Sequence, residues 1–527
     1  CIKLKVGLSI LKTDAIFMYV RWNVNSVVMR YFTSKASCIL LLVALSMGSL
    51  SAQEFDLSVK EKNEILSEFN DYLSISNVSD DALGIQNNLD FLTSYLTRFD
   101  FEVSKWEVKE TPYLYANLNV GAEKTLLIYL QLDALPADSS NWEQKDPFSP
   151  VLKHKIGSDW KEVEKGSEPI DSLALFARGA SDSKGPAFSL LHALKRLHRE
   201  GITPEVNIKI IGDTEEEKGS KNLTSLLALK SEELTADALL ILDGTRSLAD
   251  VPTLTFGARG IATMKLTVYG APSELHSGQY SGISPNPWYL MNQLVASMVG
   301  DHEEILINEF DPYKESATDL SYFESLDLGT FEQLESRLES KLYTDRLHPQ
   351  QVYQHPSLIL RGISSNTVNV KTRIPTEVTA EFELRLTPET PAERQFDLIQ
   401  KHIREQGYLI LPHPPTRAER KEYLKLLTME TTVGSVAFRT PIDSKFGDWL
   451  VSGIQRGLGK TEVLKLNTTG GSQPIGKFID ALQIEGVALR IPNPDAQIHA
   501  ANENIRLKNL FEGIQSLLGI LTQSNDF

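Results

Sequence analysis

Acidic side chains stand at the ends of short apolar segments, or directly before a helical segment, at several points in this sequence. They are Asp133, Asp182, Glu216, Glu217 and Asp243. Short apolar segments of this kind favour strands of a parallel sheet, and the carboxyl ends of such strands border one crevice. Carboxylates that share a pocket repel one another strongly, and a divalent cation is the simplest compensation. The pattern therefore predicts a metal centre built from carboxylates.

Each of these residues has an ordinary structural explanation when it is taken alone. Asp182 would most simply cap the helix that follows it, and the glutamates at 215–217 would form a solvated face. His499, in the segment Gln497–Glu503, would be a loop histidine. The combination of these residues and their order along the chain favour one shared site over separate explanations.

The segments that must position these residues predict an α/β fold. Leu126–Leu130, Val206–Ile211 and Ala238–Leu242 are apolar runs between polar loops, as expected for strands buried on both faces of a largely parallel sheet. Pro186–Leu197 has its apolar residues on one helical stripe. The amphipathic pattern of Glu503–Leu521 predicts a terminal helix that packs against the rest of the fold.

The middle of the chain has a different pattern. Ile261–Val268 and Glu377–Leu386 alternate between apolar and polar residues, as half-exposed strands do. The acidic segment Asp301–Pro349 between them predicts an insertion or a loop-rich helical stretch. We therefore expect a mixed, largely parallel sheet with helices on both faces, and an inserted α+β lid. The expected division is a catalytic domain over residues 53–257 and 437–527, with the lid over residues 258–436.

The composition is that of a globular protein longer than one compact domain. Of the 527 residues, 41% are hydrophobic and 23% are charged, which excludes a disordered or collagen-like chain. The length predicts two or three cores. The net charge of -16 argues against a nucleic-acid partner, because binding to phosphates needs a positively charged surface.

The N-terminal segment is expected to lie outside the fold. We interpret residues 1–28 as a non-native extension. Residues 29–52 combine the positive charges of Arg30 and Lys35, an apolar stretch and small residues near Ala52, as a secretory signal peptide does. Cleavage near Ala52 would give a secreted or periplasmic protein without a stable membrane anchor. It would also remove both cysteines, so that a metal must be held by His, Asp, Glu or amide oxygen.

Eight short segments carry a resemblance to a known family. They are Leu132–Pro136, Asp146–Phe148, Arg178–Gly185, Glu216–Ser220, Arg259–Gly260, His276–Gly278, Gly470–Ser472 and Ile498–Ala500. In this order and spacing the chain resembles the zinc peptidases and deacylases that include carnosinase-type dipeptidases, acetylornithine deacetylase, aminoacylase and glutamate carboxypeptidase. The resemblance runs from about residue 60 to the C-terminus, and His276–Gly278 with the large insert favours the dipeptidase branch.

The resemblance implies a site with two divalent metal ions. Asp182 would bridge the two ions, Glu217 and His499 would complete one ligand set, and Gln131 and Asp243 would complete the other. Zinc is the expected metal, with manganese or cobalt as alternatives. Two neighbouring cations lower the pKa of a shared water and polarise the scissile carbonyl, which is the chemistry of a metallopeptidase.

The resemblance also implies roles in catalysis and substrate binding. Glu216 would be the general base, with Asp133 in the catalytic set, and the two neighbouring glutamates can share the site only if they lie in a loop. His276 would steady the oxyanion from the partner subunit of a homodimer formed through the lid. The expected contacts to the substrate carboxylate are Thr372, Arg385 and Ser472. An alternative for Arg385 is a salt bridge within the lid sheet, and Thr372 could be an ordinary strand residue.

Three positions depart from the family pattern. Gln131 stands where the family has a histidine, and an amide oxygen is a weaker ligand for zinc than imidazole is. The second ion could therefore bind weakly, prefer manganese or be absent, and Asp133 must do something other than orient a ligand histidine. Ser183 replaces an acid found in many relatives. Thr469 stands where dipeptidases often have a glutamate that meets the substrate amine.

The sequence thus predicts a metal-dependent hydrolase of dipeptides or small peptides. An N-acyl amino acid deacylase or a carboxypeptidase on the same scaffold is an alternative, which the change at Thr469 favours. A non-catalytic binding protein with an impaired metal site is a second alternative, because of Gln131. A serine hydrolase is disfavoured, because no Gly-x-Ser-x-Gly elbow stands between a strand and a helix.

Overall fold

The large sheet contains the three strands that the sequence predicts for the catalytic core. The computed structural model describes residues 55–315, 317–326, 335–336, 338–343, 349–367, 372–473 and 475–527. The strands of the large sheet are, in spatial order, β1 (Glu102–Val108), β2 (Thr111–Leu118), β7 (Asn207–Asp213), β3 (Thr125–Gln131), β8 (Ala238–Leu242), β20 (Glu485–Arg490), β9 (Thr253–Thr255) and β19 (Leu464–Leu466). Strands β7, β3, β8 and β20 run parallel to one another, as expected.

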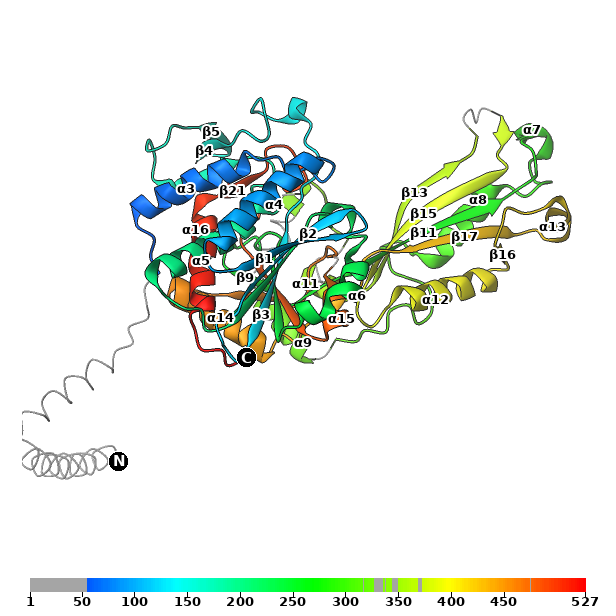
Figure 1. Cartoon of the computed structure of the whole chain (residues 1–527). Helices are drawn as coiled ribbons and strands as arrows, with labels where there is room; N and C mark the ends of the chain where they lie inside the picture. The colour runs from blue at the N-terminus through cyan, green and yellow to red at the C-terminus, as the bar shows by residue number, and fades with distance from the viewer. Residues whose placement is uncertain are drawn as a thin grey trace, which may run out of the picture. The chain divides into compact units, whose positions relative to one another are not determined.

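Helices cover both faces of the large sheet because its central strands are apolar on both sides. In β3, Leu126, Ile128 and Leu130 enter one hydrophobic cluster, and Leu127 and Tyr129 enter another. The helices that contribute to the first cluster are α3 (Val59–Leu73), α4 (Ala82–Thr97), α5 (Lys184–Glu200), α14 (Lys445–Leu458) and α16 (Leu507–Leu521) (Figure 1). Those that contribute to the second are α6 (Leu223–Leu234) and α15 (Gly476–Leu482).

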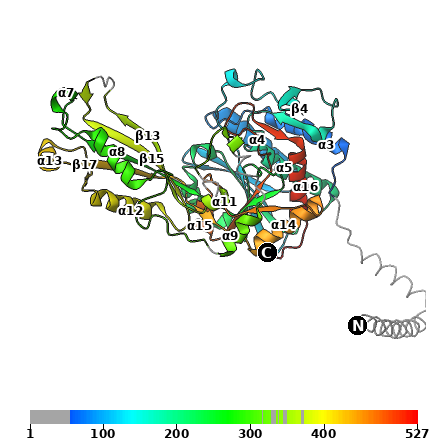
Figure 2. The same cartoon turned by 180° about the vertical axis from the view of Figure 1, so that it is seen from behind.

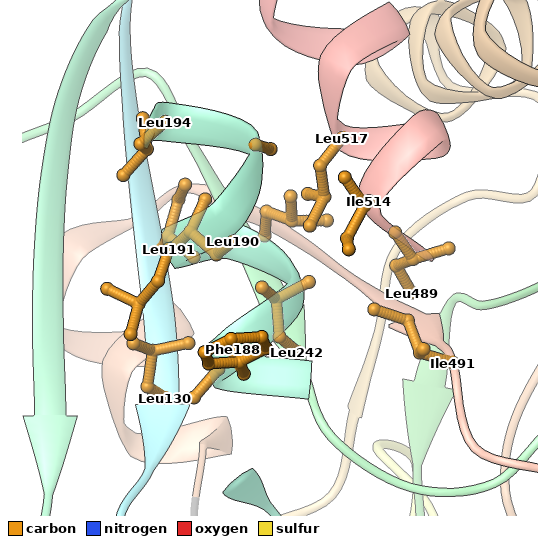
Figure 3. Packing of buried hydrophobic residues seen from close by; sticks show 14 of the residues in the cluster. Leu130, Phe188, Leu190, Leu191, Leu194, Leu242, Leu489, Ile491, Ile514 and Leu517 are labelled. Atoms are coloured by element: carbon orange, nitrogen blue, oxygen red, sulfur yellow. The ribbon is translucent and has the colours of Figure 1, made fainter. Parts of the chain in front are cut away.

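Helix α5 fixes the loop in front of it by its packing. Figure 3 shows its side chains Phe188 and Leu191 between Leu130 of β3 and Ile514 of α16. Each fully buried side chain of this size contributes about 1.5–3 kcal/mol to folding. The N-terminus of α5, directly after Asp182, is therefore held firmly against the sheet.

A second sheet, here called the lid sheet, occupies the middle of the chain. Its strands are, in spatial order, β13 (Ser357–Ser365), β15 (Glu377–Leu386), β11 (Gly260–Tyr269), β17 (Leu426–Val433) and β16 (Leu409–Leu411). Alternate residues of β15 are buried under α8 (Pro287–Met298) and α12 (Ala392–Glu405), as the period of two predicts (Figure 2). The lid sheet with α8 and α12 forms an α+β unit, and the boundaries 258–436 of the lid domain stay a prediction.

The remaining described elements are short and connect the two large sheets or border them. The strands are β10 (Gly257–Ala258) with β18 (Phe438–Arg439), β12 (Leu275–His276) with β14 (Arg373–Ile374), and the sheet of β21 (Asn504–Arg506), β6 (Leu173–Phe176), β4 (Val151–Ile156) and β5 (Asp159–Glu162). The helices are α7 (Ser277–Tyr280), α9 (Ala317–Ser325), α11 (Pro349–Val352) and α13 (Arg417–Glu422). The 3-10 turns are η1 (Ser139–Asn141), η2 (Ile170–Ser172) and η3 (Glu216–Lys218).

One predicted element begins later than expected. The terminal helix α16 starts at Leu507, whereas the sequence pattern predicted a start at Glu503. The residues before it form β21, in which Asn504 pairs with Phe176 of β6. This pairing places Glu503 beside the loop that follows β6, where it has a role described below.

The predicted extension over residues 1–28 and the predicted signal peptide over residues 29–52 lie outside the described residues. Of the predicted insertion Asp301–Pro349, the described part includes α9, helical residues at 335, 336 and 338 and the start of α11 at Pro349, with turns and loops elsewhere. Among the described residues, no helix is both long enough and apolar enough to cross a membrane.

Candidate metal centre

Three neighbouring parallel strands end at the same edge of the large sheet. β3 ends at Gln131, β7 ends at Asp213, and β8 ends one residue before Asp243. β3 pairs with both of the other strands. Because the carboxyl ends of parallel strands border one crevice, the loops that follow them face the same space.

The loop that carries Asp182 is held by the buried carboxylate of Glu503, which has no exposed surface. This carboxylate accepts hydrogen bonds of 2.8 to 3.0 Å from Arg178 Nη1 and from the backbone N–H groups of Gly179, Ser181 and Asp182. The N-cap residue of α5 is Ser183, without a capping side-chain bond, so the simple helix-cap explanation of Asp182 does not hold. Glu503 positions the backbone of Asp182 and leaves the Asp182 carboxylate available for the site.

Asp182, Glu217 and His499 form a compact group of metal-ligand type. His499 Nε2 lies 3.0 Å from Asp182 Oδ2 and 3.4 Å from Glu217 Oε2. One ligand atom from each residue can be chosen so that all lie within 4.8 Å of one another. Atoms bound to one tetrahedral zinc ion at about 2.0–2.1 Å lie roughly 3.3 Å apart, so this spacing suits a single ion.

Glu216 and Glu217 reach the site from the turn η3, as the sequence analysis required. The turn is held by Asp133, whose two oxygens accept the backbone N–H groups of Glu216 (3.0 Å) and Glu217 (3.2 Å). Asp133 itself is completely buried. Its contacts are therefore those of a residue that positions both glutamates. This is the role that Asp133 has in the absence of a histidine at position 131.

Burial and mutual repulsion change the pKa of several groups in this site. Burial, followed by repulsion from Asp213, raises the pKa of Asp133 to about 8. Burial, followed by repulsion from Asp243 and Asp182, raises the pKa of Glu216 well above its usual range. Hydrogen bonds to Asp182 and then to Glu217 raise the pKa of His499 to about 10. A divalent cation among these carboxylates would relieve the repulsion, so the donor set and its electrostatics both fit a metal ion.

The ligands expected for a second ion have other partners. Gln131 Nε2 donates to Glu217 Oε1 (3.2 Å) and to the backbone oxygen of Asp133 (3.3 Å). Asp243 accepts from Ser183 Oγ at 3.4 Å and from Gln473 Nε2. The structure therefore places Gln131 and Asp243 at the site, each bound to a neighbouring side chain.

Two arginines form a cationic corner beside the segment Gly470–Ser472. Arg385 Nη1 lies 3.4 Å from Ser472 Oγ, and its Nε donates to Glu383 at 2.7 Å. Arg259 donates from Nε and Nη2 to the backbone oxygen of Gly470, at 3.0 and 2.9 Å. Burial, followed by repulsion from Arg385, lowers the pKa of Arg259 to about 10. The alternative salt bridge within the lid is thus present at Arg385, and its role in binding the substrate carboxylate stays a prediction.

His276 and Thr372 lie together, apart from Arg385. His276 pairs with Arg373 across β12 and β14, and Ser277 N donates to Thr372 O at 2.8 Å. Thr372 precedes β15 and Arg385 lies near its end, and at about 3.4 Å per residue the distance from Glu377 to Arg385 is on the order of 27 Å. Within one chain, the structure does not bring Thr372 to the other two predicted substrate residues.

Comparison with known proteins decides the family. The profile of the peptidase family M20/M25/M40 matches residues 127–523. The chain belongs to this family. The Cys-Gly metallodipeptidase of Schizosaccharomyces pombe is 25% identical to this M20-family chain over 498 residues, covering 88% of this chain and 95% of the yeast protein. The Beta-Ala-His dipeptidase of Homo sapiens is 27% identical over 302 residues, covering 55% of this chain and 56% of the human protein.

Solved structures agree on the fold of the M20 family. The M20 family metallo-carboxypeptidase Sso-CP2 from Sulfolobus solfataricus aligns with a TM-score of 0.71 at 23% identity, over 87% of this chain and 98% of that one. Human carnosine dipeptidase 1 aligns with a TM-score of 0.66 at 21% identity, over 88% of this chain and 96% of that one. The predicted fold class and the predicted class of enzyme, a metallopeptidase, are confirmed.

Sequence reasoning missed several residues that complete this M20 site. Glu503, Ser183 and Gln473 each contact a predicted site residue or its backbone, and Arg259 contacts Gly470 in the segment of the predicted Ser472, but none had been given a role in the site. Glu503 and Arg259 lie within or beside family segments, so their position was a usable signal. Gln473 directly follows the family segment Gly470–Ser472, but only the folded chain brings it to Asp243.

Replacing Asp133 by asparagine is expected to lower kcat/KM of this peptidase by about 10–100-fold, as loss of outer contacts at metal sites does. Asparagine has one acceptor oxygen, so one of the N–H groups of Glu216 and Glu217 would face an NH₂ group. Peptide hydrolysis by the variant checks this expectation. Asp138→Asn is a matched control, because Asp138 accepts the N–H of Ser140 in an exposed turn. Equal effects of the two changes would contradict the positioning role of Asp133.

Proposed function

We propose that this protein hydrolyses the amide bond of dipeptides or other small peptides, using a divalent metal ion bound by Asp182, Glu217 and His499. The observation that carries the proposal is the position of Glu216, whose backbone N–H donates to Asp133 and which lies on the same turn as the proposed ligand Glu217. A carboxylate beside the ligands, but not needed as one of them, suits a general base. The names of the two relatives described above support dipeptides as the substrate class.

The bound ion would supply a Lewis acid that polarises the scissile carbonyl and makes water more acidic. Glu216 accepts a proton from the attacking water, whose oxygen bonds to the carbonyl carbon. The carbon–nitrogen bond then breaks, and Glu216 returns the proton to the leaving amine. Asp133 and Glu503 keep the base and the ligand loop in place during these steps.

Zinc is the metal we propose for the three-residue set, since imidazole and carboxylate oxygen are its usual ligands without cysteine. Manganese or cobalt would be accepted by the same donors. We also propose that the protein acts outside the cytoplasm after cleavage near Ala52, on the basis of the predicted signal peptide alone.

The cationic corner of Arg385 and Arg259 is proposed to bind the substrate carboxylate. Replacing Arg385 by lysine is expected to raise KM on the order of 10-fold, with a smaller change in kcat, because one charge-assisted hydrogen bond is lost. Steady-state kinetics on a dipeptide checks this. Arg394→Lys is the control, because Arg394 bonds to the backbone oxygen of Glu309 in the lid. A change in kcat with no change in KM would contradict substrate binding at this corner.

We propose that the site is completed by a second copy of the chain, with His276 of the partner subunit acting on the substrate. The support is that His276 and Thr372 lie at the end of β15 away from Arg385. The variants Glu216→Ala and His276→Ala should each be inactive. When they are mixed and allowed to exchange subunits, about a quarter of wild-type activity should return, because half of the dimers then contain one complete site. Mixtures that stay inactive, although exchange is shown, would place His276 in the site of its own chain.

A panel of dipeptides and N-acyl amino acids tests the proposed reaction. Chelator-treated protein reloaded with zinc or manganese should cleave dipeptides. Preference for the N-acyl amino acids would instead indicate a deacylase, which the lack of a carboxylate at Thr469 favours. Folded protein that cleaves neither class with either metal would support the non-catalytic binding protein.

A further inference from the structure

We propose that the chain binds one resident metal ion, at Asp182, Glu217 and His499. Neutral hydrogen-bond donors of the protein bond to carboxylates of the site in place of a second ion. These donors are the amides of Gln131 and Gln473 and the hydroxyl of Ser183. The inference rests on the proposed function, and it concerns how many ions the site holds. It departs from the two-ion site that the family resemblance implies.

The amide of Gln131 faces acceptor oxygens. Its side chain is 2% exposed, and its Nε2 lies 3.2 Å from Glu217 Oε1 and 3.3 Å from the backbone oxygen of Asp133. Both partners are acceptors, so the NH₂ end of the amide must face them. Gln131 therefore faces Glu217 with its NH₂ end, and not with the carbonyl oxygen that would bind a metal ion.

The carboxylate of Asp243 also contacts hydrogen-bond donors of the protein. Its Oδ2 accepts from Gln473 Nε2, and its Oδ1 lies 3.4 Å from Ser183 Oγ. Gln473 is 6% exposed, and its Oε1 has no hydrogen-bond partner among the described residues. The Gln473 amide is thus oriented by its bond to Asp243. Both oxygens of the carboxylate that would ligate a second ion face donors of the protein.

The carboxylate of Asp182, which would bridge two ions, contacts a different side chain with each of its oxygens. Its Oδ2 faces His499 at 3.0 Å, and its Oδ1 lies 3.2 Å from Ser183 Oγ. One hydroxyl, Ser183, thus lies within reach of both Asp182 and Asp243. The second site would have two carboxylates and an amide oxygen but no imidazole, which is a weak set for zinc.

Metal counting on the full chain tests the inference. Chelator-stripped protein is loaded with zinc, passed over a desalting column and analysed for zinc per chain, and manganese-loaded samples are examined by electron paramagnetic resonance. One zinc per chain and an uncoupled manganese spectrum are expected. Gln131→His should raise the count to two per chain and give an exchange-coupled manganese spectrum. Gln131→Leu should stay at one.

Controls separate this inference from the proposed function. Gln86→His places a histidine beside the carboxylate of Asp90 on the surface of α4, and should leave the count at one. His499→Gln should reduce the count toward zero, with thermal unfolding showing that the variant is folded. Two ions in the wild-type chain would overturn the inference alone. No bound ion in folded wild-type protein would overturn the proposed function as well.

Discussion

Replacing Glu216 by glutamine is expected to lower kcat for a dipeptide by about 10²–10⁴-fold, the usual contribution of a general base. Glutamine keeps the size of the side chain but cannot accept a proton from water. The backbone N–H of residue 216 would still donate to Asp133 Oδ1, so the turn that carries Glu217 keeps its support. The amount of zinc bound per chain should therefore stay the same. Turnover at saturating peptide and metal analysis check the two halves of this prediction.

Lys218→Gln is the matched control for this substitution. Lys218 lies on the same turn η3, but its Nζ donates to the backbone oxygen of Ser79 at the surface. We expect kcat of this variant to stay within about threefold of wild type, because surface changes have small effects. A Glu216→Gln enzyme that keeps more than a tenth of wild-type kcat would remove Glu216 from the role of base.

Replacing Glu503 by alanine is expected to lower the free energy of unfolding by about 3–5 kcal/mol, the usual cost of removing one partner of a buried ion pair. The variant leaves the Arg178 guanidinium without its carboxylate and removes the acceptor for three backbone N–H groups, including that of Asp182. The loosened loop should also weaken zinc binding by about 10–100-fold. Denaturant unfolding and zinc titration measure the two effects separately.

The variant Glu512→Ala is the control that separates loss of positioning of the Asp182 loop from a general loss of folding stability. Glu512 bonds to Arg246 at 2.6 Å from helix α16, which follows Glu503 in the chain, so its loss should also destabilise the fold. Among the described residues, its carboxylate pairs with Arg246 and Lys508 and not with the Asp182 loop, so the affinity for zinc should be unchanged. If Glu503→Ala binds zinc as tightly as Glu512→Ala, Glu503 does not position the ligand loop.

The main elements of the fold could be predicted because their patterns are local. The segments that form β3, β7 and β8 are mostly apolar and buried, whereas β15 alternates in polarity because α8 and α12 cover one of its faces. The start of α16 was wrong by four residues, because β21 depends on pairing with β6, more than 300 residues earlier in the chain. No local pattern contains that information.

The candidate site was predicted in part for the same reason. The ligands and Glu216 stand in short family segments, so type and order were sufficient to find them. The partners of Asp133 and Glu503 are backbone N–H groups, which look the same in every sequence. The contacts of Gln131 with Glu217 and of Gln473 with Asp243 join residues that are distant in the chain. These contacts show which partners Gln131 and Asp243 have when glutamine stands at position 131 in place of the family's histidine.

The most direct test of the account is dipeptide hydrolysis by metal-free protein as zinc is added back. Turnover should be absent without metal, rise with added zinc and reach a plateau, and the His499→Gln variant should stay inactive at the same zinc concentrations. Hydrolysis that survives complete metal removal, or that is equal in the His499→Gln variant, would contradict a metal-dependent peptidase at Asp182, Glu217 and His499.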